Sequence, residues 1–227
     1  MTQTRARLLR IVLMAALYLA VSLFGGIWGW RLLYPIRLFV TFMHEFGHAF
    51  GALITGGSVD YIRIEPNSGG LTVTRGGNTP LILMGGYLGS ALFGNILFYI
   101  GAAKPKWVKP TLGLVIAVML LTGLIWYNSL FTTALLCVFS AGLFYLGFKT
   151  KYGRDMLMFL GLASLLYILQ DSASGPSSDL AAFKNEMRFL PAIVWLGLWV
   201  GVALGLLAFN LKLLLKKKEK LKSKDKF

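Results

Sequence analysis

Two histidines and a glutamate occupy the stretch His44-Glu45-Phe46-Gly47-His48, which lies inside an apolar segment. In a helix the two histidines, four residues apart, project from one face about one turn apart. Both imidazoles can then reach one tetrahedral Zn²⁺, with Glu45 beside the metal as a general base. They are the only histidines among 227 residues. Ionisable groups are costly inside an apolar, membrane-spanning segment. We therefore interpret the two histidines and Glu45 as a metal site rather than as polar residues bonded to a neighbouring helix.

The composition is that of an integral membrane protein. Hydrophobic residues make up 56% of the chain and charged residues only 14%, against about a quarter charged in typical soluble domains. Several apolar runs approach the roughly 20 residues that cross a bilayer. The net charge of +14 comes from residues at the ends of these runs and in the C-terminal tail, which indicates contact with anionic lipid rather than nucleic acid. We expect a multi-pass protein of a bacterial plasma membrane, with an organelle membrane as the alternative.

The apolar pattern predicts an all-α polytopic bundle of about seven transmembrane helices with one small β-hairpin. The second helix, from Arg31 to about Thr55, carries the histidines. Two β-rich runs, residues 59–64 and 71–74, follow it around a glycine-rich turn. They predict a membrane-associated hairpin that must be shielded by protein or lie at the membrane surface. We assign residues 1–215 to a single membrane domain and residues 216–227 to a lysine-rich disordered tail.

The basic residues bear on membrane orientation. With seven spans, the basic loops at 104–109 and 149–154 share a side with the lysine tail. The positive-inside rule places that side in the cytoplasm. Arg5, Arg7 and Arg10 would then fall on the opposite side, unless an early segment fails to span. The absolute orientation is therefore left open.

A third ligand is needed, because a catalytic zinc takes three protein ligands and keeps one open position. No third histidine exists, so a carboxylate must complete the set. Asp60 and Glu65 in the hairpin and Glu186 in a charged helix lie where solvated acids are ordinary. Asp171 ends an apolar run and Asp179 lies in the polar loop after it, so both are better placed. Either aspartate could bind the metal, while the other accepts a hydrogen bond from the N–H of a metal-binding histidine.

Several stretches together resemble the M50B-like branch of the site-2 protease family, polytopic zinc metalloproteases that cut substrates within or near the membrane. The resemblance rests on the histidine motif with the residues 49–57 after it, the hairpin, the glycine-rich run 85–95 and the late Ser178-Asp179-Leu180. It implies a zinc cofactor and a transmembrane protein as substrate. The resemblance also favours Asp179 over Asp171 as third ligand, because Asp179, in Ser-Asp-Leu, lies at the start of a helix, as the ligand aspartate of the family does. The family's usual Leu-Asp-Gly around that ligand is absent here.

These residues predict a zinc-dependent endopeptidase. Zinc lowers the pKa of its bound water, the nucleophile, toward about 7 and polarises the scissile carbonyl, while Glu45 takes the water's proton and passes it to the leaving amine. The hairpin offers a strand edge to which an unwound substrate segment can add. Asn95 is a candidate substrate-binding residue, with an interhelical hydrogen bond as its alternative role.

Two other functions were weighed. The first is a catalytically inactive membrane scaffold or a substrate-capturing pseudoprotease of the same fold. The intact Glu45 argues against it, since a pure binder needs no such base. The second is a metal transporter, which would place ionisable ligands along a path on several spans, whereas the ligands here cluster at one depth.

Overall fold

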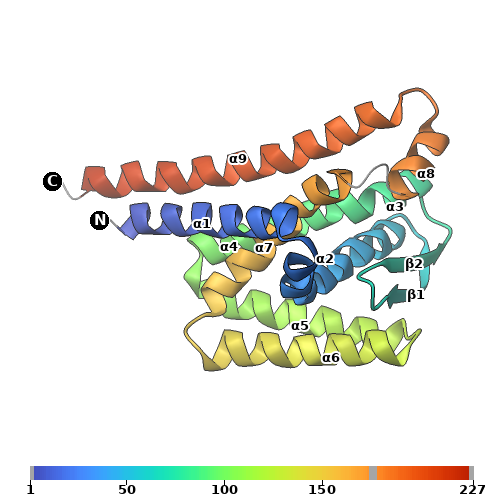
Figure 1. The fold of residues 1–227 in the computed structure, drawn as a ribbon, viewed down its shortest axis with the longest axis horizontal. Helices are drawn as coiled ribbons and strands as arrows, with labels where there is room; N and C mark the ends of the chain where they lie inside the picture. Colours follow the sequence, from blue (N-terminus) through green and yellow to red (C-terminus); the bar gives the residue numbers. More distant parts are fainter. Residues whose placement is uncertain (1–2, 174–177, 225–227) are drawn as a thin grey trace.

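The computed structural model describes residues 3–173 and 178–224, with side chains described for residues 9–167 and 179–215. Helices dominate the described chain, and one two-stranded sheet interrupts them after the second helix (Figure 1). In chain order the elements are α1 (Gln3–Phe24), α2 (Gly26–Ile54), β1 (Ser58–Ile64), β2 (Gly70–Arg75), α3 (Thr79–Met84), the π-helical turn η1 (Gly85–Gly89), α4 (Ser90–Ala103), the 3₁₀ turn η2 (Pro105–Trp107), α5 (Val108–Ile125), α6 (Leu130–Phe144), the π-helical turn η3 (Tyr145–Lys149), α7 (Gly153–Ala173), α8 (Ser178–Met187) and α9 (Ala192–Lys224).

Four helical segments of the described chain are long and apolar enough to cross a membrane: Thr79–Ala103, Pro105–Ile125, Leu130–Lys149 and Ala192–Leu215. A shorter apolar helix, Leu9–Phe24, lies in α1. These segments support the expected helical membrane protein with a small sheet. The expected count of about seven spans is not confirmed.

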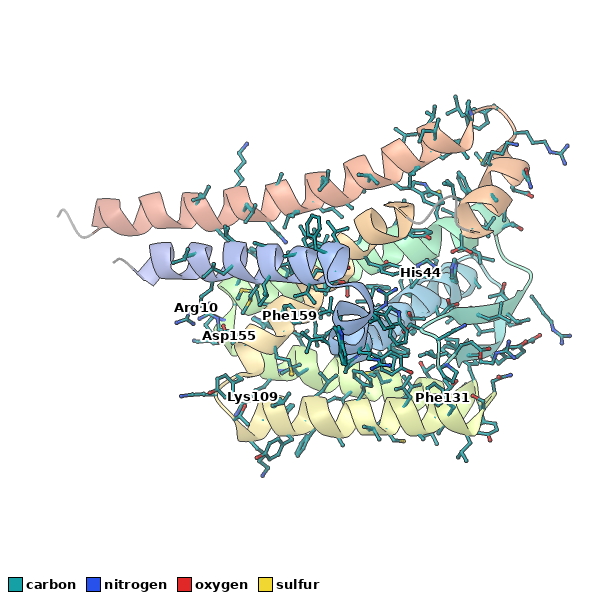
Figure 2. The ribbon with its side chains drawn as sticks, in the orientation of Figure 1. Arg10, His44, Lys109, Phe131, Asp155 and Phe159 are labelled. Atoms are coloured by element: carbon teal, nitrogen blue, oxygen red, sulfur yellow. The ribbon has the colours of Figure 1, made fainter. Side chains whose placement is uncertain are left out.

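The two ends of the described chain lie together. α1 begins and α9 ends at the same end of the molecule (Figure 1). A guanidinium nitrogen of Arg10 in α1 is 3.8 Å from a carboxylate oxygen of Asp155 at the start of α7. Figure 2 shows both residues at the end that also holds Lys109. Seven complete crossings would put the two ends on opposite sides of a membrane. Arg10 instead lies at the same end of the molecule as the basic loops, which agrees with the alternative given above, that an early segment does not span.

The interior is built around α2 and the pair of helices α4 and α7. A Cβ at Gly94 of α4 would come within 2.7 Å of the Gly161 carbonyl oxygen of α7, so small residues are needed for this close approach. Every residue of α2 from Leu38 to Glu45 is buried. The helix that carries the two histidines is therefore enclosed by protein.

The hairpin prediction is confirmed. β1 and β2 pair in antiparallel fashion, with a bulge between Val59 and Tyr61. Protein covers the outer edge of β1: the Ile64 N–H donates to Thr132 Oγ1 at 3.0 Å, and the Ile62 N–H donates to the Trp126 carbonyl at 3.5 Å. These partners satisfy backbone groups that lipid could not.

Two helix boundaries differ from expectation. α2 begins at Gly26 rather than Arg31, because the tryptophan-containing stretch before Arg31 belongs to this helix. α9 continues to Lys224, through most of the segment for which a disordered tail was expected. Lysine, leucine and glutamate all have high helix propensity, so they can prolong a helix that is already formed.

Candidate metal centre

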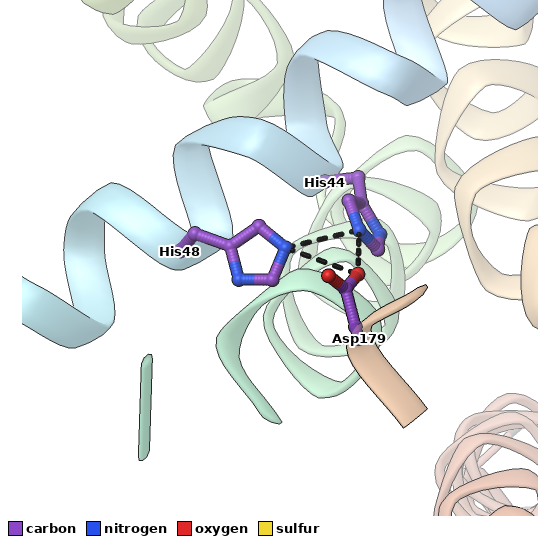
Figure 3. A group of neighbouring side chains, drawn as sticks. All are labelled: His44, His48 and Asp179. Carbon is purple, nitrogen blue, oxygen red and sulfur yellow. Dashed lines mark hydrogen bonds and ion pairs between the residues drawn. The ribbon is translucent and has the colours of Figure 1, made fainter. Parts of the chain in front are cut away.

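Three side chains from two distant parts of the chain meet at one point (Figure 3). The Nε2 atoms of His44 and His48 are 3.1 Å apart. Asp179 Oδ2 lies 2.8 Å from His44 Nε2 and 3.3 Å from His48 Nε2. Both histidines are buried. The spacing of four residues in α2 therefore does what the sequence predicts, and the fold adds a carboxylate from 135 residues away.

The carbonyl of Ile82 orients His48. His48 Nδ1 donates to the Ile82 oxygen at 2.7 Å. A carbonyl can only accept, so Nδ1 carries the proton and, in the neutral ring, Nε2 is left with a lone pair. Ile82 lies in α3, just before the π-helical turn η1. Such turns occur frequently at functional sites, where they displace the backbone from regular helix geometry.

Helix α8 positions Asp179 in its first turn. Leu180 and Phe183 of α8 are buried, and the Phe183 ring packs edge-on against Trp195 and Trp199 of α9. Burial acts to raise the pKa of the Asp179 carboxyl, but the two histidines, when their rings carry a proton on Nε2, outweigh this and hold the pKa well below its usual range. The carboxyl group is therefore ionised at neutral pH, as a metal ligand must be.

The hairpin fixes Glu45. This residue is buried, and the Thr72 hydroxyl lies 2.7 Å from Glu45 Oε2 and 2.9 Å from the Glu45 backbone oxygen. In addition, two hydroxyl groups of α2 bind the turn of the hairpin. Tyr34 donates to the Pro66 carbonyl at 2.6 Å and Thr41 donates to the Ser68 carbonyl at 2.8 Å. The hairpin is thus attached along one face of α2, and its strand β2 passes beside Glu45.

One cavity joins these groups. Its volume is about 660 Å³, and His44, Glu45, His48 and Asp179 all line it. Strand β2 contributes Gly70, Leu71, Thr72 and Thr74 to the same wall, and Tyr87 and Tyr167 close it on the side of the helices. The Tyr87 ring stands edge-on to His44, with 4.7 Å between the ring centroids.

The donor set fits zinc. Two imidazole nitrogens and one carboxylate oxygen are ligands that zinc prefers, and tetrahedral bonds of 2.0–2.2 Å would separate the ligand atoms by about 3.3 Å. The separations of 3.1 and 3.3 Å from His48 Nε2 are close to this spacing, and the 2.8 Å between His44 and Asp179 is shorter, so a bound zinc would move these two side chains slightly apart. Gly86 keeps the adjacent space open: a Cβ there would lie 2.5 Å from His48 Nε2 and 2.6 Å from His44 Nε2.

The other residues singled out in the sequence lie as follows. Asp171 belongs to the last turn of α7, but its side chain is outside the described residues, so its role as an alternative ligand stays a prediction. Asn95 of α4 accepts a hydrogen bond from Asn210 Nδ2 at 2.6 Å. It is not among the described residues that line the cavity. This contact is the interhelical bond given above as its alternative role.

Sequence reasoning missed four contributors: Thr72, Gly86, Tyr87 and the Ile82 carbonyl. The glycine-rich run from Gly85 marked the neighbourhood of Gly86 and Tyr87, since closely spaced glycines indicate a close backbone approach. No sequence signal identified Thr72 or the Ile82 carbonyl, because their roles depend on how distant segments pack.

A comparison with protein families agrees with this geometry. The family model described as Peptidase M50B-like matches residues 9–210, a range that contains both histidines, Glu45, the hairpin and Asp179. No curated protein and no solved structure matches the chain. Because the family match spans most of the sequence, the chain belongs to the Peptidase M50B-like family.

Proposed function

We propose that this protein is a zinc-dependent endopeptidase that cleaves membrane proteins within or near the bilayer. The observation that carries the proposal is the convergence of His44 Nε2, His48 Nε2 and Asp179 Oδ2 on one point of a cavity that Glu45 also lines. His44, His48 and Asp179 would hold the metal. When bound there, zinc would polarise the scissile carbonyl and make an attacking water more acidic.

Glu45 supplies the proton transfers. Its carboxylate takes one proton from the water that attacks the carbonyl carbon, and it gives that proton to the amine nitrogen as the C–N bond breaks. The products are a carboxylic acid and an amine, and Glu45 returns to its initial state. Thr72 holds the carboxylate in place through the step. Burial excludes bulk water from the base, so its position and its hydrogen bond are preserved.

The hairpin suits an extended substrate. A transmembrane helix keeps its carbonyls in internal hydrogen bonds, so a segment must unwind before it can be cut. Thr132 and Trp126 already cover the outer edge of β1, while residues of β2 line the cavity. We therefore propose that the unwound segment adds along β2 by strand pairing and passes Glu45 and the histidines.

The bundle itself is part of the proposal. Besides the four candidate spans, we propose that α1, α2 and α7 lie within the bilayer, as the seven-helix expectation requires. Because α1 begins at the same end as α9 ends, one of the first two helices would not cross completely. In a Cys137→Ser background, single cysteines introduced at Trp28 and Thr55 and labelled from each side of the membrane would locate the two ends of α2. Labelling of both positions from one side would reject a crossing by α2.

The experiment that tests catalysis compares the wild type with Glu45→Gln. Both proteins, purified in detergent, are incubated with solubilised membrane proteins, and new N-termini are identified by mass spectrometry. We expect zinc in both proteins and new N-termini with the wild type only, since removal of a general base costs about 10²- to 10⁴-fold in rate. Zinc without any product difference between the two would reject the protease and favour an inactive, substrate-capturing member of the same fold.

A further inference from the structure

A second cavity lies at the opposite end of the molecule from the hairpin, between the α4–α5 connection and the turn before α7. Its volume is about 350 Å³. Four cationic side chains line it, Lys106, Lys109, Lys151 and Arg154, together with Thr150. No aspartate or glutamate is among the described residues that line it. Figure 2 shows Lys109 at this end of the molecule, far from His44.

Among the described residues, the lysines of this basic pocket have no acidic partner. No described carboxylate lies within 4.0 Å of the ammonium groups of Lys106, Lys109 or Lys151. Instead, Lys109 Nζ stands 6.0 Å from the centre of the Phe148 ring, and Lys151 Nζ stands 5.5 Å from that of Tyr152. Aromatic faces can hold an ammonium group in position without neutralising it. The pocket therefore keeps its positive charge available.

The walls of the basic pocket are fixed by backbone contacts. Arg154 Nε and Nη2 donate to the carbonyls of Gly101 and Ala102 at the end of α4, each at 2.7 Å. The Thr150 hydroxyl donates to the Leu146 carbonyl at 2.6 Å and accepts from the Tyr152 N–H at 3.1 Å. The helices α5 and α7 begin at the pocket, while α4 and the helical segment up to Lys149 end there, so the helix dipoles offset one another and the positive charge comes from the side chains.

The depth of the basic pocket in the membrane follows from the candidate spans. Three of the four candidate spans have an end at this pocket: Thr79–Ala103 and Leu130–Lys149 end here, and Pro105–Ile125 begins here. The lining residues fall directly at these ends, between 105 and 109 and between 147 and 154. Helix ends of this kind lie at the level of the lipid headgroups. A cationic cavity at that level faces phosphate groups of the bilayer.

We propose that this basic pocket binds a phosphate group presented by an anionic phospholipid. The ammonium groups of Lys109 and Lys151 would bind the phosphate oxygens, while the acyl chains lie against the apolar outer surface of the bundle. Basic pockets between transmembrane helices are suited to such headgroups. This site is independent of the proposed protease chemistry, since none of its residues lines the cavity at His44.

The test measures binding to the full chain in a zwitterionic or non-ionic detergent by isothermal titration calorimetry. The probes are short-chain phosphatidylglycerol, short-chain phosphatidylcholine and inorganic phosphate. The variants are Lys109→Gln and Lys151→Gln, both at exposed positions, and the matched control is Lys184→Gln, an exposed lysine of α8 outside the pocket. Each change removes one positive charge, so general electrostatic attraction falls equally in all three proteins.

We expect phosphatidylglycerol to bind the wild type more tightly than phosphatidylcholine does. Lys109→Gln and Lys151→Gln should each weaken this binding roughly fivefold, the contribution of one lysine near a charged phosphate. Lys184→Gln should weaken it by clearly less, through the loss of net charge alone. Equal weakening in all three variants would overturn the proposal that the phosphate binds specifically at the basic pocket. If inorganic phosphate binds as tightly as phosphatidylglycerol, the bound phosphate group need not belong to a lipid. The pocket would then be assigned to a soluble phosphate.

Discussion

The hydroxyl of Thr72 is 2.7 Å from the Glu45 carboxylate and 2.9 Å from the backbone oxygen of the same residue. The hairpin thus reaches the proposed general base directly. A hydrogen bond to a charged group contributes about 1.5–3 kcal/mol, enough to keep one carboxylate conformation dominant. The same strand is the one proposed to receive the substrate, so Thr72 connects the substrate-binding edge with the catalytic group.

Thr72→Val should lower kcat by about tenfold or more, because valine keeps the shape of threonine but cannot donate to Glu45. The measurement is single-turnover cleavage of a peptide identified by the N-terminal mapping above, with zinc content measured on the same samples. Thr72→Ser, which keeps the hydroxyl, should retain most of the rate. A variant that loses zinc together with rate, or a serine that fails to rescue, would show that Thr72 does not act through Glu45.

Gly86→Ala should abolish zinc binding. The added methyl group would lie 2.5 Å from His48 Nε2 and 2.6 Å from His44 Nε2, so one imidazole has to move from the metal position. Metal analysis of the purified protein measures the result directly. The matched control is Gly142→Ala in α6, where a Cβ meets nothing within 4 Å. Retention of zinc by Gly86→Ala would contradict the position assigned to the metal.

Thr132→Val should loosen the hairpin. The Thr132 hydroxyl accepts from the Ile64 N–H and donates to either the Ile64 carbonyl at 3.3 Å or a nearby hydroxyl, and a buried N–H left without a partner costs about 1–3 kcal/mol. Hydrogen exchange at the Ile64 amide should accelerate about tenfold or more. The control is the neighbouring Thr133 of α6, whose hydroxyl donates to the Gly123 carbonyl of α5. If Thr133→Val accelerates Ile64 equally, α6 has been disturbed as a whole.

Part of the site was predictable from sequence for a simple reason. His44, Glu45 and His48 occupy one helix, and helix geometry alone places the two histidines on a common face. The hairpin was predictable because its strand residues flank a turn whose residues permit no regular helix. Local periodicity and local turn chemistry are enough for both.

The remainder depends on tertiary packing. Asp179 and Asp171 both satisfied the local criteria. The docking of α8, against α3 and through Phe183 against α9, brings the Asp179 carboxylate to the histidines. The partner of His48 is a backbone carbonyl, which every residue possesses, so no side-chain pattern could reveal it. The position of Arg10 beside Asp155 depends in the same way on how α1 lies against the bundle.

The most direct test of the account is the zinc content per chain of the purified protein, measured for the wild type, Asp179→Asn, Asp171→Asn and Asp60→Asn. Asparagine keeps the shape of aspartate but removes the negative charge, and Asp60 is a control because it pairs with exposed Arg75 in the hairpin. We expect about one zinc in the wild type, Asp171→Asn and Asp60→Asn, and a loss confined to Asp179→Asn. No zinc in the wild type after reconstitution with the metal, or full zinc in Asp179→Asn, would contradict it.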